Sequence, residues 1–195
     1  HNLENNNYSG INLVASAPAA GGYDIIGMLD YFLGLDTYHV PYYIAYVAMG
    51  YKTSYDWDTE LNKMFNEPYA SIIPDYFNGK YSGSEINNVL NDTISVLLTS
   101  NFINNTYSDP NLRIIIDALE ENSLDNWVPK TKMLMYHGTS DITVPYQNSV
   151  DTYNNFINNG ASESIIELIP LNGKTHSSGA LPYIIDLFDK FNSLK

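Results

Sequence analysis

The stretch that decides the fold is residues 132–146, KMLMYHGTSDITVPY. Its first five residues form an apolar run of the right length for a β-strand, and Val144 and Pro145 then open a segment with helical periodicity. In that segment apolar side chains recur every three or four residues, at Tyr146, Val150, Tyr153 and Ile157. The stretch therefore predicts a strand, a loop and a helix that Gly160 ends.

Two further apolar runs complete the predicted sheet. Residues 11–17 (INLVASA) lie between Gly10 and Pro18, and residues 164–169 (SIIELI) follow the helix. A strand–helix–strand connection is right-handed and joins parallel strands. We expect a last helix to pack against the sheet through one apolar stripe: Leu181, Ile184, Ile185, Phe188 and Phe191. The pattern is typical of an α/β fold.

The middle of the chain has a different character. Residues 21–128 show helical periodicities and little strand character. Ser82 and Glu85 predict a capping box, and Asp109 before Pro110 predicts the start of another helix. We therefore expect a helical cap or lid insertion of residues 21–128 within a core of residues 1–20 and 129–195.

Asp141 and His176 are the candidate catalytic residues. Asp141 lies just past the end of the second strand, and His176 lies in the loop after the third. Parallel sheets place their sites outside the carboxyl ends of the strands, so the two side chains are expected to meet. Asp141 would accept from one imidazole nitrogen and leave the other free to take a proton from a serine hydroxyl. Plainer interpretations are a loop aspartate that bonds its own turn and an exposed loop histidine.

The pattern HGxxDxxVP of residues 137–145, followed by His176, resembles the acid and base segments of α/β hydrolases. It is most similar to bacterial secreted lipases, esterases and prolyl-oligopeptidase-like peptidases. Residues 11–25 (INLVASAPAAGGYDI) also resemble the strand that follows the nucleophile helix in those proteins. The resemblance implies the C-terminal part of an α/β-hydrolase fold, a serine hydrolase acting on carboxylic ester or peptide bonds, and export from a bacterial cell. His137 is expected to support the loop rather than to act in catalysis.

The nucleophile of such a hydrolase is not recognisable in the sequence. The family places it in a GxSxG elbow before the acid and base, and no such motif occurs here. The serines Ser9, Ser16, Ser140, Ser177 and Ser178 all stand in the wrong context. We expect the elbow to lie upstream of His1, so that this chain alone is inactive. The N-terminal part of the same hydrolase, or a second chain, is expected to cover the edge of the sheet.

The composition argues against several other functions. A formal net charge of -13 disfavours binding to phosphate backbones, so no nucleic-acid partner is expected. The longest apolar stretch, residues 40–50, is shorter than the roughly 20 residues of a membrane helix. The chain has no cysteine, and its scattered histidines show no metal-ligand spacing, so neither a metal nor another cofactor is expected.

The helical insertion is rich in tyrosine. One hypothesis is an apolar acyl or aromatic pocket, and the alternative is that these side chains pack the core of the insertion: Tyr38, Tyr42, Tyr43, Tyr46 and Tyr51. Two other functions stay open. One is a non-catalytic binding or assembly module on a hydrolase fold, and the other is glycan binding through the many Asn and Tyr residues.

Overall fold

The computed structural model describes residues 1–6, 8–57 and 60–193. The chain divides into two compact units, His1–Met28 with Ser123–Lys195 and Leu29–Asn122. We call the first the sheet unit and the second the helical unit. The structure groups residues 21–28 and 123–128 with the sheet unit, whereas the sequence placed them in the insertion.

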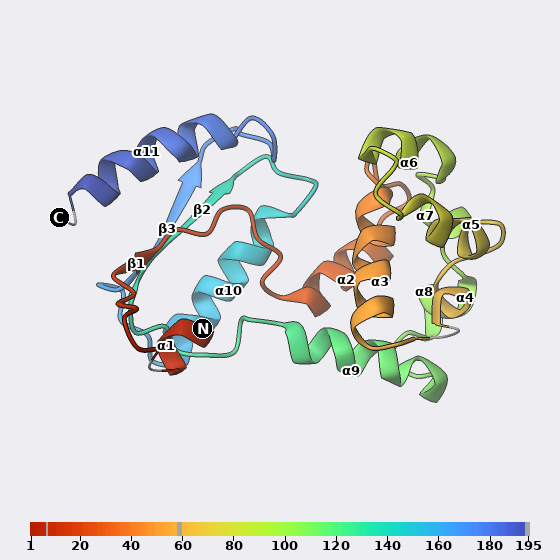
Figure 1. Cartoon of the computed structure of the whole chain (residues 1–195), viewed down its shortest axis with the longest axis horizontal. Coiled ribbons are helices and arrows are strands. Elements are labelled where there is room, and N and C mark those ends of the chain that lie inside the picture. Colours follow the sequence, from red (N-terminus) through yellow and green to blue (C-terminus); the bar gives the residue numbers. More distant parts are fainter. Residues whose placement is uncertain (7, 58–59, 194–195) are drawn as a thin grey trace. The chain divides into compact units, whose positions relative to one another are not determined.

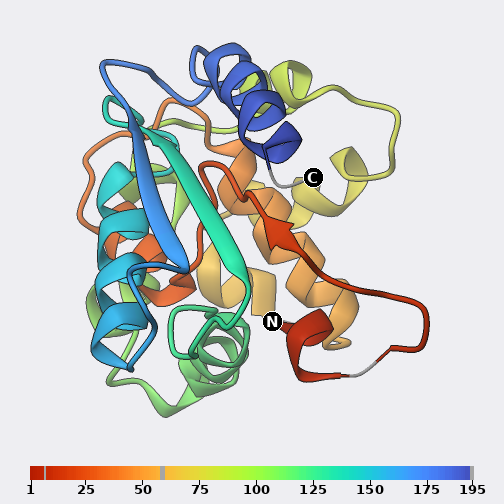
Figure 2. The ribbon, with the colours of Figure 1, turned by 90° about the vertical axis from the view of Figure 1, so that its left-hand side faces the viewer.

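The sheet unit contains three parallel strands in the order β1–β2–β3, which Figure 2 shows as red, teal and blue strands side by side. They are β1 (Ala15–Ser16), β2 (Lys132–Gly138) and β3 (Ile166–Leu171). The register runs from Met133 opposite Ile166 to Gly138 opposite Leu171, so the carboxyl ends of β2 and β3 lie side by side at the same end of the sheet. The predicted α/β fold with three parallel strands is confirmed, although β1 is much shorter than its apolar run.

The central strand is covered on both faces. The helix α10 (Tyr146–Asn158) lies on one face and α11 (Ala180–Asn192) on the other, as Figures 1 and 2 both show. On the α10 side, Met135 packs with Phe156 and Ile166 in a buried cluster. On the α11 side, the hydroxyl of Tyr136 donates to Asp186 at 2.7 Å. Burial on both faces explains why β2 is a continuous apolar run rather than an alternating one.

The helix α10 turns a partly polar face to the sheet. Its fully buried side chains are Asn148, Ser149, Thr152 and Phe156. The residues of the predicted stripe are only half-buried, and of these Tyr153 packs on the buried cluster. Asn148 explains part of this difference, because its amide joins the helix to a distant loop. Its Oδ1 accepts from the backbone nitrogen of Tyr23 at 2.9 Å, and its Nδ2 donates to the carbonyl of Asp24 at 2.7 Å. For Asn148, these hydrogen bonds compensate for the burial of a polar side chain.

The predicted last helix is present, but its apolar stripe does not pack against the sheet. Among its described side chains none is buried, and Leu181, Ile185 and Phe188 are 68%, 57% and 65% exposed. The helix contacts the sheet through Tyr183, whose ring lies 5.0 Å from that of Tyr136. The helix therefore lies against the sheet as expected, but the expectation that it packs there through its apolar stripe was wrong, because the stripe is exposed.

The N-terminal residues belong to the sheet unit. The short helix α1 (Asn2–Asn5) is attached there through Glu4, whose carboxylate accepts from the backbone nitrogens of Lys130 and Thr131 at 3.0 and 2.7 Å. The helix α2 (Ile25–Leu33) begins in the sheet unit and ends in the helical unit.

The helical unit is built from short helices around its own core. Its most buried side chains include Phe65, Leu97, Phe102, Leu112 and Ile115. Both predicted caps are present, with the capping box of Ser82 and Glu85 and with Asp109 accepting from the next turn. The elements after α2 are α3 (Tyr42–Ser54), α4 (Glu60–Met64), α5 (Tyr69–Tyr76), α6 (Gly83–Val89), α7 (Ile94–Leu97), α8 (Ser100–Asn105), a 3-10 turn (Pro110–Leu112) and α9 (Arg113–Asn122).

Within the described residues, no helix has both the length and the apolar character that crossing a bilayer would require.

Candidate active site

Asp141 lies in the turn that follows β2. Its backbone nitrogen bonds to the carbonyl of Gly138 at 3.1 Å, and its side chain is fully buried. One carboxylate oxygen, Oδ1, accepts from the backbone nitrogens of Thr143 and Val144 at 2.9 and 3.1 Å. The aspartate thus bonds its own turn, as the plainer interpretation expected. Its other oxygen remains available for a second partner.

That partner is His176, which lies in the loop between β3 and α11. Its Nδ1 is 2.8 Å from Asp141 Oδ2, and its side chain is 34% exposed. An ionised carboxylate only accepts hydrogen bonds, so Nδ1 carries the hydrogen and Nε2 keeps a free lone pair. The structure therefore brings together the two residues that the sequence singled out.

Backbone hydrogen bonds hold the two loops against each other. The nitrogen of Ser140 donates to the carbonyl of Lys174 at 3.0 Å, and the nitrogen of Gly173 donates to the hydroxyl of Thr139 at 2.8 Å. Gly138 makes this approach possible, since a Cβ at that position would overlap the carbonyl of Lys174. The separation between acid and base is consequently set by main-chain contacts as well as by the side chains.

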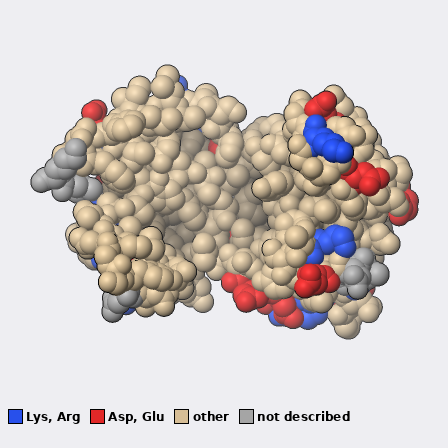
Figure 3. Space-filling model, in the orientation of Figure 1, with Lys and Arg blue, Asp and Glu red and all other residues tan. Residues whose placement is uncertain are grey.

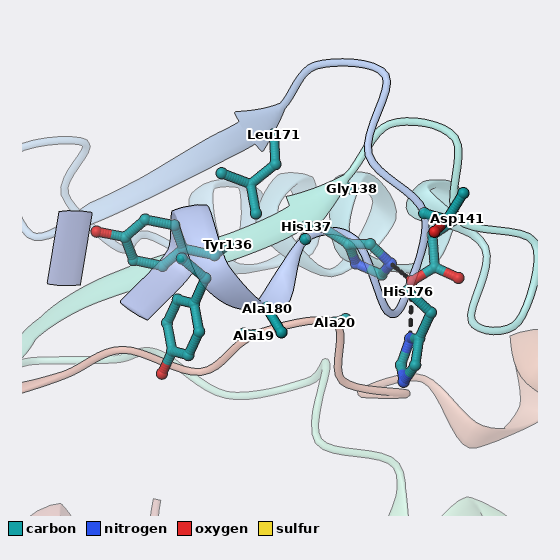
Figure 4. A pocket seen from close by; sticks show the side chains of 12 residues that line it. Ala19, Ala20, Tyr136, His137, Gly138, Asp141, Leu171, His176 and Ala180 are labelled. Atoms are coloured by element: carbon teal, nitrogen blue, oxygen red, sulfur yellow. Dashed lines mark hydrogen bonds and ion pairs between the residues drawn. The ribbon is translucent and has the colours of Figure 1, made fainter. Parts of the chain in front are cut away.

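A pocket of about 170 Å³ lies beside the pair. Figure 4 shows His137, Asp141 and His176 at one end of it and Tyr136 at the other. Ala20 contributes to its wall with a positive φ of 46°, a conformation that non-glycine residues adopt mainly under constraint. The remaining lining is mostly small or apolar: Ala19, Gly138, Leu171, Thr175, Gly179, Ala180 and Tyr183. No serine is among the described residues that line it.

The carboxylate of Asp141 is stabilised in its ionised form. Burial alone raises the pKa of a carboxyl group, but hydrogen bonds from His137, His176 and the Val144 nitrogen outweigh that effect. The pKa of Asp141 therefore lies below its ordinary value of 3.8. An anion at this position would stabilise an imidazolium at His176 whenever Nε2 takes up a proton.

The five candidate tyrosines all lie in the helical unit, and none lines this pocket. Tyr38 is only 2% exposed, whereas Tyr46 is 63% exposed. The rings of Tyr42 and Tyr43 lie 4.2 Å apart, and Tyr51 stacks on Trp57. Burial of Tyr38 agrees with the alternative of core packing, while ligand contact by the others stays a prediction.

Sequence reasoning missed one polar cluster. His137 Nε2 lies 3.3 Å from Asp141 Oδ2, and His137 Nδ1 lies 2.6 Å from the hydroxyl of Ser149 on α10. The HG pair in the motif was a signal for His137, but no spacing pointed to Ser149. Within the described chain, no group of three or more potential ligands is arranged to hold a metal ion.

No protein-family model matches the chain, and no curated protein matches its sequence. Solved structures do match it. A protein from Legionella pneumophila, assigned by inference as a hydrolase, has a TM-score of 0.78 at 20% identity over 96% of this chain and 50% of its own. The chain has an α/β-hydrolase fold.

Two other similar structures are enzymes. The rice cell wall degrading esterase LipA from Xanthomonas oryzae matches with a TM-score of 0.74 and 24% identity, over 94% of this chain and 50% of its own. Candida antarctica lipase A matches with a TM-score of 0.66 and 15% identity, over 93% of this chain and 43% of its own. The chain thus spans about half the length of these α/β-hydrolase structures.

Proposed function

We propose that this α/β-hydrolase chain supplies the acid, Asp141, and the base, His176, of a serine hydrolase that cleaves carboxylic ester bonds. The observation that carries the proposal is the 2.8 Å hydrogen bond between His176 Nδ1 and a buried carboxylate with a lowered pKa. This arrangement orients an imidazole with one nitrogen free at the mouth of a pocket. It is the arrangement that activation of a serine hydroxyl requires.

In the proposed reaction, His176 Nε2 takes the proton of a serine as the serine oxygen attacks the ester carbonyl. The imidazolium is stabilised by Asp141 and returns the proton to the departing alkoxide, which leaves as the alcohol. Water then attacks the acyl-enzyme in the same way and releases the acid. Because no described serine lines the pocket, we place the nucleophile on a polypeptide segment outside this chain.

The sheet unit offers a surface for that segment. β1 lies at one edge of the sheet, so one side of it is unpaired within the described sheet. The outward stripe of α11 adds exposed apolar side chains, and Figure 3 shows few charged groups on the sheet unit in that view. Together with the match to only half of the Legionella and Xanthomonas chains, this supports a covering segment from the same protein or from a second chain.

Esters are the first substrates to test, because two of the matched structures are an esterase and a lipase. The peptidase alternative uses the same acid and base and differs in the leaving group. The low content of charged residues and the net charge of -13 favour neutral or cationic substrates over anionic ones. Export from the cell belongs to the same proposal and rests on the resemblance to secreted hydrolases.

The test is a fluorophosphonate probe applied to the protein purified with whatever chains accompany it, followed by intact mass measurement. The probe labels a serine that a working base activates, so it needs no assumed substrate. We expect one label on a co-purifying segment, and we expect it to be lost in His176→Ala. The matched control is His39→Ala, because His39 is exposed in the helical unit and lies outside the pocket.

Equal labelling in both variants would contradict the proposed role of His176. No labelling of any chain would favour the alternative function, a binding module that keeps the fold without the reaction.

A further inference from the structure

His137 faces the same carboxylate oxygen as His176. Its imidazole is fully buried, with Nε2 at 3.3 Å from Asp141 Oδ2 and 2.9 Å from the carbonyl oxygen of Val144. Figure 4 shows the two imidazoles approaching Asp141 from different sides. Since a carbonyl oxygen can only accept, Nε2 of His137 carries a hydrogen.

The other nitrogen of His137 faces the helix α10. Nδ1 lies 2.6 Å from the hydroxyl oxygen of Ser149, which is fully buried on α10. The tautomer with its hydrogen on Nε2 satisfies both contacts, because Nε2 then donates to the Val144 carbonyl and Nδ1 accepts from the Ser149 hydroxyl.

We propose that His137 is a positioning residue for the acid–base pair: fixed in this tautomer by Ser149, it shares its Nε2 hydrogen between the Val144 carbonyl at 2.9 Å and Asp141 Oδ2 at 3.3 Å, and so holds the carboxylate toward His176. The inference rests on the proposed function and adds to it. It assigns His137 a role that it performs through Asp141, with no contact to the reacting atoms.

The geometry shows what His137 adds to the two backbone donors. Thr143 and Val144 donate to Oδ1 and would still leave Oδ2 with His176 as its one side-chain partner. A donor on a rigid strand gives Oδ2 a second, fixed contact and limits rotation of the carboxylate. Hydrogen atoms of His137 and His176 that point toward Oδ2 also stabilise the negative charge of the Asp141 carboxylate, which favours its ionised form.

The test compares two substitutions by carbon NMR of the Asp141 carboxyl group, assigned with Asp141→Asn. His137→Leu removes the donor, whereas His137→Gln places an amide nitrogen near the former position of Nε2. We expect the pKa of Asp141 to move upward in His137→Leu and to stay close to its native position in His137→Gln. The titratable groups around the site are His137 from β2, His176 from the loop before α11, and Tyr146 on α10, whose ring is 5.7 Å from that of His137.

Thr152→Val is the matched control. Thr152 is as deeply buried as Ser149, on the same helix, but its hydroxyl has no hydrogen-bond partner among the described residues. We expect this variant to leave the Asp141 titration unchanged. An unchanged titration in His137→Leu, or the same upward shift in His137→Gln, would overturn the proposal.

Nitrogen NMR of histidine-labelled native protein gives a second test that does not depend on whether His137→Leu folds. The ring of His137 is identified by the signals that are lost in His137→Gln, which separates it from the three other histidines of the chain. We expect this ring to carry its hydrogen on Nε2 and to accept at Nδ1. Protonation of the His137 ring on Nδ1 would refute the assignment. The carbon and nitrogen NMR experiments both use this chain alone and need no nucleophilic serine. Failure of the probe labelling, which tests the proposed function, can therefore be distinguished from failure of this inference.

Discussion

At the residue scale, the pairing of Asp141 and His176 makes a direct prediction about rate. In the proposed hydrolase, that is, this chain assembled with its covering segment, Asp141→Asn is expected to lower kcat/KM for simple esters by about 10³- to 10⁴-fold. The reason is that an amide no longer holds the imidazole of His176 in the tautomer that can take up a proton at Nε2. Initial rates with short-chain chromogenic esters provide the measurement. His39→Ala should keep the native rate, and a loss of less than about tenfold in Asp141→Asn would argue against a triad role.

Asp141 also makes stability depend on pH in a defined direction. Its pKa is lower in the folded chain than the ordinary 3.8, so its stabilising contribution is complete above that value. The contribution is lost as the pH falls through the lower, folded-state pKa. We expect the difference in unfolding free energy between native protein and Asp141→Asn to be largest near neutral pH and to shrink below about pH 4.

Urea unfolding from pH 7 to pH 3 measures this difference. Glu85 and Asp109 also have lowered pKa values, but both are present in native protein and variant and so cancel in the comparison. A difference that does not change with pH would mean that Asp141 titrates alike in the folded and unfolded chains.

At the element scale, Asn148 tests whether polar groups fix the position of α10. Asn148→Ala removes the acceptor for the Tyr23 nitrogen and the donor to the Asp24 carbonyl. Leaving buried backbone groups unpaired is expected to cost about 3 kcal/mol of unfolding free energy. Asn154→Ala, an exposed position on the same helix, should change the urea midpoint little, and equal effects of the two substitutions would contradict the assignment.

The junction of β2 with the loop that carries His176 makes a second prediction at this scale. Gly138→Ala is expected to cost about 1–3 kcal/mol and to separate acid and base, because its Cβ would meet backbone atoms of Lys174. Gly50→Ala in α3 is the matched control, since a Cβ there meets no atom within 4 Å. That control should gain about 0.5–1 kcal/mol from lower flexibility of the unfolded chain. Urea unfolding gives both values, and a neutral Gly138→Ala would show that the loops can move apart freely.

The elements themselves were largely predictable from the sequence, because apolar runs and caps are local signals. The run of residues 132–136 became β2, and the Ser82 and Glu85 capping box formed as its spacing indicated. The candidate site was only partly predictable. The motif pointed to His176 as the partner of Asp141, but the contact between Ser149 and His137 depends on how α10 packs on the sheet. Ser149 is a polar residue that is buried where its hydroxyl contacts His137, and the spacing of apolar residues cannot predict such a position.

At the scale of the whole molecule, the proposed function and the exposed surface both lead to the proposed covering segment. The pocket has the proposed acid and base but no described serine, and the described sheet has an unpaired edge at β1. The apolar stripe of α11 was predicted to pack on the sheet, but it is exposed. Periodicity shows that a helix has an apolar face, and it does not show which surface that face contacts. A covering segment that carries the nucleophile would satisfy both the chemistry and the exposed apolar surface.

That surface leads to the last prediction. Ile185 and Phe188 are exposed on α11, so the double substitution Ile185→Glu with Phe188→Glu should change unfolding free energy by no more than about 0.5 kcal/mol per site. The same change should abolish binding of the covering segment, because two buried carboxylates would face an apolar partner. Light scattering with size-exclusion chromatography measures the assembly, and probe labelling should be lost with it. Val47→Glu introduces a charge at an exposed apolar residue of the helical unit and should leave assembly intact. Unchanged assembly in the double variant would show that the covering segment does not bind α11, and the serine would have to reach His176 from another side of the pocket.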